Sequence, residues 1–174
     1  LGGKKTIEVS SGSDTRIDLS DNVLSTTGPF AIYFAIHPLI TLLKLCGNTA
    51  SSSQLQASLV NSEIRLAVAS SGSGASVTAS VSGGNLSGRP VLIGLLRRTD
   101  STSNRLVIRH KFAGSAWVET AASAYCTSDG LVGGSLRTIA ATFSAGVFSA
   151  TASYTFASRL GQIAVFSSDL GTTN

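Results

Sequence analysis

The feature that most constrains this chain is a period of two in its apolar residues, which is clearest near the end of residues 89–112. There, one set of residues is apolar apart from a histidine: Leu106, Ile108, His110 and Phe112. The alternate set is mostly basic: Arg105, Val107, Arg109 and Lys111. Successive side chains of a strand point to opposite faces of a sheet, so this pattern predicts a strand with an apolar and a basic face. A second apolar run lies before the polar residues 99–104, and the two runs together predict a β-hairpin.

Similar alternating runs recur along the chain, bounded by turn residues. The strongest covers residues 30–38, and residues 54–60 and 63–69 flank Asn61-Ser62, which predicts a hairpin with a tight turn. Residues 40–46 fit either a strand or a short helix, and residues 70–76 are rich in Ser and Gly and predict a linker. Weaker strand patterns occupy residues 7–9, 17–19, 77–81, 117–125, 136–143, 147–154 and 161–166. Together they predict about ten to twelve short strands.

This pattern predicts an all-β fold. Nothing in the sequence alternates strands with helices, so we do not expect a parallel α/β sheet. Each predicted strand has one apolar face to bury, and two antiparallel sheets packed as a β-sandwich would bury all of them. The length of 174 residues fits a single domain, residues 1–174, with residues 1–5 and 168–174 expected to be loose ends.

Composition narrows the range of partners. Charged residues make up 13% of the chain and the net charge is +4, which permits an anionic partner without requiring one. Aromatic residues make up only 6%, so nucleic acid is not an expected partner. No apolar run is long enough to cross a bilayer, and we expect no membrane insertion. Cys46 and Cys126 fit either one disulfide or two buried thiols.

The order of these features resembles the concanavalin A-like and laminin G-like jelly-roll β-sandwiches over about residues 30–171. The similar segments are an aromatic alternation ending in proline at residues 28–38, the hairpin at 54–69, the strand pair at 91–108 and the closing run at 161–171. The resemblance implies a binding module for glycans or protein surfaces, sometimes dependent on calcium. Modules of this general kind also occur on virion surfaces and fibres.

The sequence shows no catalytic constellation. Glycosidases on this kind of sandwich need two carboxylates at a fixed separation. Glu8, Glu63 and Glu119 each lack an acid two or four residues away, and Asp14, four residues before Asp18, lies in a turn cluster. His37 and His110 lie within strand patterns, and we expect His110 to be a hydrogen-bonded core residue. We therefore expect no enzymatic activity.

The densest candidate binding group is basic and lies on the predicted hairpin: Arg97, Arg98, Arg105, Arg109 and Lys111. If the hairpin pairs around residues 99–104, Arg97 or Arg98 comes close to the other three. Arginine forks match sulfate, uronate and phosphate oxygens, so this basic hairpin face predicts a site for an anionic glycan or an acidic protein surface. The alternative is that these charges only keep a strand edge soluble.

Two smaller groups are also candidates. Trp117, the only tryptophan, is either a stacking surface for a sugar or a partly buried core residue. Asp18, Asp21 and Asn22 offer oxygen ligands for calcium, and the alternative is that they only form local turns.

We therefore expect a non-catalytic binding or attachment module that recognises a surface glycan or a protein surface, outside cells or on a virion. The alternative is a structural module of a larger assembly, such as a phage capsid decoration or fibre protein. In that case the same surface would contact further copies of the chain or scaffold subunits.

Overall fold

The computed structural model describes residues 7–9, 17–18, 29–39, 42–47, 54–70, 73–81, 86–100, 103–121, 138–139 and 158–166. These residues form strands, turns and short connections, and no helix occurs among them. The fold is therefore all-β over the described part of the chain, as the sequence predicts.

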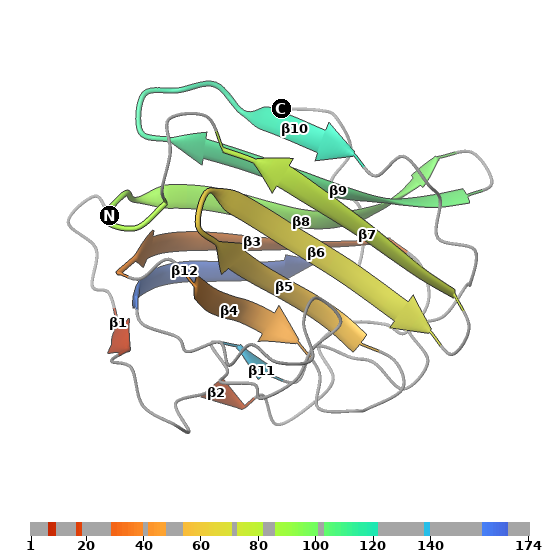
Figure 1. Ribbon diagram of the computed structural model, residues 1–174, viewed down its shortest axis with the longest axis horizontal. Coiled ribbons are helices and arrows are strands. Elements are labelled where there is room, and N and C mark those ends of the chain that lie inside the picture. Colours follow the sequence, from red (N-terminus) through yellow and green to blue (C-terminus); the bar gives the residue numbers. More distant parts are fainter. Residues whose placement is uncertain are drawn as a thin grey trace.

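The strands form two antiparallel sheets of six strands each. Sheet A has the order β1 (Ile7–Val9), β12 (Ser158–Phe166), β3 (Phe30–Pro38), β8 (Val91–Asp100), β9 (Ser103–Phe112) and β10 (Val118–Ala121). Sheet B has the order β2 (Ile17–Asp18), β11 (Thr138–Ile139), β4 (Leu42–Gly47), β5 (Gln54–Val60), β6 (Glu63–Ser70) and β7 (Ser73–Ser80). In Figure 1, β6 and β7 lie across β8 and β9, so the sheets stack as the predicted β-sandwich.

The core lies between the two sheets and follows the period of two. Phe30, Ile32, Phe34 and Ile36 of β3 are at most 1% exposed. They belong to one cluster with Ile93 and Leu95 of β8 on the same sheet and with Ile64 and Leu66 of β6 on the other. Burying each of these side chains contributes about 1.5–3 kcal/mol, and this burial holds the sheets together.

Both predicted hairpins are confirmed by the strand register. In the first, Val60 pairs with Glu63 around a turn whose first residue, Asn61, has a φ of 54°. The carbonyl groups of Asn61 and Ser62 accept hydrogen bonds from the amides of Leu86 and Val81, at 3.2 and 2.7 Å. In the second hairpin, β8 pairs with β9 from Val91–Phe112 to Asp100–Ser103.

One segment contradicts its prediction, and a second resolves an ambiguity that the sequence left open. The predicted linker at residues 70–76 is wrong, because β6 continues to Ser70 and β7 begins at Ser73 with a regular register between them. An edge strand pairs through its backbone, so small side chains do not prevent it from forming. The ambiguous run at residues 40–46 contains a strand, β4, which pairs with β5. The predicted loose ends at residues 1–5 and 168–174 and the predicted strand at 147–154 lie outside the described residues.

Sheet A also carries apolar residues on the face that points away from sheet B. Ala31, Leu96 and Val107 lie side by side in the register and are at most 1% exposed, and Tyr33 packs against them. They form a second, smaller cluster outside the sandwich core. The outer face of a sheet in a β-sandwich is usually polar, so this apolar outer face is unusual. The candidate site lies on this face.

Candidate ligand-binding face of sheet A

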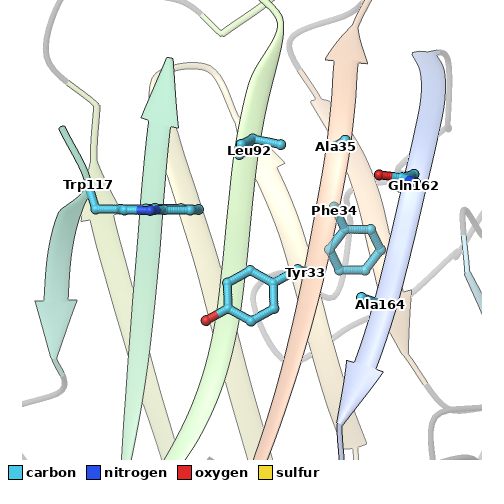
Figure 2. A pocket seen from close by; sticks show the side chains of 7 residues that line it. All are labelled: Tyr33, Phe34, Ala35, Leu92, Trp117, Gln162 and Ala164. Atoms are coloured by element: carbon cyan, nitrogen blue, oxygen red, sulfur yellow. The ribbon is translucent and has the colours of Figure 1, made fainter. Parts of the chain in front are cut away.

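A shallow hollow of about 190 Å³ lies on the outer face of sheet A (Figure 2). Its lining residues come from β3, β8 and β12 and from the connection before β10: Tyr33, Phe34, Ala35, Leu92, Trp117, Gln162 and Ala164. Ala35 and Ala164 leave room beside the larger rings, and Gln162 supplies the one amide side chain of the lining. We call this feature the outer hollow.

Tyr33 is the central ring of the outer hollow. It pairs with Gly94 in the register, and a Cβ atom at Gly94 would lie only 2.6 Å from the Tyr33 Cε1 atom. The glycine therefore allows the phenol ring to lie against β8. Trp117 and Phe166 approach Tyr33 edge-on from opposite sides, with ring centroids 6.2 and 6.3 Å away. The three rings form a row that crosses sheet A from β10 to β12.

Trp117 lies outside the sandwich core, so the interpretation as a partly buried core residue is wrong. Its side chain is 36% exposed and borders the outer hollow, where it faces Leu92 and Tyr33 across the sheet (Figure 2). Leu92 and Phe166 are 40% and 37% exposed on the same face. This group of exposed apolar side chains is the type of surface that marks a binding site.

The basic hairpin face adjoins these rings. Arg109 places its guanidinium carbon 5.3 Å from the centroid of the Trp117 ring, and Lys111 places its Nζ atom 5.7 Å from it. Both distances fall within the range of cation–π attraction. The two cations therefore lie beside the indole ring and bring positive charge to the edge of the outer hollow.

Glu119 joins two of the arginines. Arg98 donates from Nη1 and Nη2 to the two carboxylate oxygens of Glu119, at 2.7 and 2.9 Å, as a bidentate fork. The Arg109 Nε atom lies 3.3 Å from Oε2 of the same carboxylate. Glu119 cannot be recognised as a site residue from the sequence, because 21 residues separate it from Arg98 and only the strand register brings the two together.

Arg97 does not belong to this face, and its assignment to the basic hairpin face is wrong. It pairs with Phe30 and Leu106, both core residues, and is fully buried. Since successive residues of a strand point to opposite sides, only one of Arg97 and Arg98 can point outward, and that residue is Arg98. Arg105, which pairs with Arg98, is partly exposed on the outer face.

His110 lies in the core, as expected. It is 3% exposed, and its ring meets Phe112 edge-on with centroids 6.1 Å apart. Burial lowers the pKa of His110 below its ordinary value of 6.5, because desolvation disfavours the charged imidazolium. Its Nδ1 atom is buried and has no hydrogen-bond partner among the described residues, so the expected hydrogen bond is not made at this atom.

The structure leaves the calcium prediction open. Asp18 is the second residue of β2, whereas Asp21 and Asn22 lie outside the described residues, as does Cys126. Within the described part of the chain, no group of three or more His, Cys, Asp or Glu residues could hold a metal ion. No helix among the described residues is long and apolar enough to cross a membrane.

The two stacked sheets form a laminin G-like β-sandwich, and solved structures bear this out. Domains LG4-5 of the mouse laminin α1 chain superpose with a TM-score of 0.62 at 8% identity, covering 92% of this chain and 40% of that one. The LG1-3 region of the laminin α2 chain gives 0.56 at 10% identity, covering 93% and 31%. The enzymatically active domain of tailspike protein 2 from bacteriophage CBA120 gives 0.54 at 15% identity, covering 92% and 27%.

The chain spans less than half the length of each of these three proteins. At such low identities the likeness shows the fold alone. No protein-family model matches the sequence, and no curated protein matches it either.

Proposed function

We propose that this chain is a non-catalytic binding module that holds a saccharide against the outer hollow of sheet A. The exposed Trp117 ring, which borders an apolar hollow and meets Tyr33 edge-on, carries this proposal. An exposed indole offers a rigid apolar surface at little cost in conformational entropy, and the apolar face of a sugar ring can stack on such a surface. Gln162 and the neighbouring cations offer polar contacts for sugar hydroxyl groups.

The composition of the outer hollow supports binding without catalysis. Its lining contains no Asp, Glu or His, whereas glycoside hydrolysis uses a pair of carboxyl groups flanking the bond. Glu119, on the same face, is engaged by two arginines. The resemblance of the fold to laminin domains and to a tailspike supports a location outside cells or on a virion surface.

Replacing Trp117 tests this proposal directly. We expect Trp117→Ala to weaken binding of a saccharide identified on a glycan array by about tenfold or more, because exposed tryptophans that contact a ligand dominate its binding energy. Isothermal titration calorimetry measures the affinity. Leu39→Ala is the matched control, since Leu39 is a similarly exposed apolar residue, 38% exposed, beyond the end of β3.

An unchanged affinity in Trp117→Ala would contradict the proposal. A second role then becomes the better explanation, because an apolar hollow with exposed Leu92 and Phe166 also fits the surface of a neighbouring subunit in a larger assembly. Light scattering distinguishes the two roles. A defined oligomer that Trp117→Ala dissociates, together with no saccharide binding, would support the structural role.

A further inference from the structure

We infer that the saccharide carries a carboxylate and that Glu119 is an internal stand-in for it, held by Arg98 and Arg109 until the ligand replaces it. This inference rests on the proposed function and adds the chemical class of the ligand. In the free protein, Glu119 would neutralise part of the charge of the two arginines. In the complex, the carboxylate of a uronic acid would take its place.

The geometry around Glu119 is that of a carboxylate-binding site. The fork of Arg98 meets both carboxylate oxygens, at 2.7 and 2.9 Å, and Arg109 contacts one of them at 3.3 Å. Two parallel N–H···O bonds match a planar group with two oxygens. A uronate presents the same planar group, attached to a sugar ring. A sulfate ester also offers two oxygens to an arginine fork, so the test includes a sulfated oligosaccharide.

The position of this group fits the proposed stacking surface. Arg109 contacts the Glu119 carboxylate and also lies 5.3 Å from the Trp117 ring centroid. A sugar ring stacked on Trp117 would therefore lie beside a guanidinium that already binds a carboxylate. Lys111, 5.7 Å from the same ring, adds a further positive charge at this edge.

The difference in exposure indicates which partner can leave. The side chain of Glu119 is 37% exposed, whereas those of Arg98 and Arg109 are only 15% and 18% exposed. An exposed carboxylate regains its hydration when it turns into solvent, so giving up such an ion pair costs little. The more buried guanidinium groups would pay more if left unpaired, and an incoming carboxylate keeps them paired.

The test compares Glu119→Gln with the wild type by isothermal titration calorimetry, using an oligogalacturonate and a neutral chito-oligosaccharide of equal length. We expect roughly two- to fivefold tighter binding of the uronate, the scale of one ion pair between exposed groups. The neutral sugar should bind equally to both proteins. Glu63→Gln is the matched control, because Glu63 pairs with Arg65 at 2.6 Å on sheet B, and it should change neither affinity.

Unchanged or weaker binding of the oligogalacturonate by Glu119→Gln would overturn the inference, provided that thermal unfolding shows an intact fold. Failure of both proteins to bind it would overturn it as well. An equal gain for a sulfated oligosaccharide would overturn the preference for a carboxylate. If the neutral sugar still binds and Trp117→Ala abolishes that binding, the proposed function stands although this inference fails.

Discussion

Gly94 decides how closely the Tyr33 ring can approach sheet A. A Cβ atom there would lie 2.6 Å from Tyr33 Cε1, so Gly94→Ala must displace the ring. We expect the free energy of unfolding, measured by urea denaturation, to fall by about 1–3 kcal/mol, and saccharide binding to weaken as the ring moves. In a Tyr33→Ala background the same substitution should cost far less. An equal cost in both backgrounds would place the strain in the backbone instead.

His110 makes the stability of the protein depend on pH. Its pKa in the folded state lies below 6.5, so the unfolded chain takes up a proton first as the pH falls. The free energy of unfolding should therefore decrease as the pH drops below about 6.5, and the decrease should level off below the folded-state pKa. Chemical denaturation at a series of pH values measures this slope.

The matched variants for this slope are two histidine replacements. His110→Phe keeps an aromatic ring beside Phe112 and removes the titrating group. It should therefore flatten the dependence of the unfolding free energy on pH below about pH 7. His37→Phe, at a partly exposed position of β3, is the matched control for replacing a histidine by phenylalanine. A slope that survives in His110→Phe would assign the pH dependence to other groups.

At the scale of the element, the β5–β6 turn depends on one left-handed residue. Asn61 has a φ of 54°, which asparagine and glycine tolerate and β-branched residues do not. We expect Asn61→Val to lower the free energy of unfolding by about 1–3 kcal/mol in urea denaturation. Asn61→Gly should stay close to the wild type, and an equally large loss there would point to the Asn61 side chain rather than to its backbone.

Single elements were predictable where the period of two was unbroken. The alternation in residues 30–38 and the turn signal at Asn61-Ser62 correspond directly to β3 and the β5–β6 hairpin. The segment before β7 was not predictable, because Ser and Gly are common in linkers and an edge strand needs only backbone pairing. The sequence did not show which of Arg97 and Arg98 points outward, because the apolar run before them, VLIGLL, does not alternate.

At the scale of the whole molecule, the sandwich could be predicted but the outer hollow could not. Periodicity shows which residues share a face of one strand, and it correctly gave the outward direction of Arg109 and Lys111. It does not show which strands are neighbours. Gln162 and Tyr33 line the same hollow only because β12 pairs with β3, more than a hundred residues away along the chain.

The position of β12 between β1 and β3 has a consequence for how the protein is made. A ribosome releases the chain from its N-terminus, so β1 and β3 emerge long before the strand that separates them. Until residues 158–166 are free, sheet A lacks the strand that pairs with β3 on the side away from β8, and the apolar side chains at that edge stay open to water, a condition that favours aggregation. We therefore expect the chain to be most prone to aggregation before the last described strand, β12, has been synthesised.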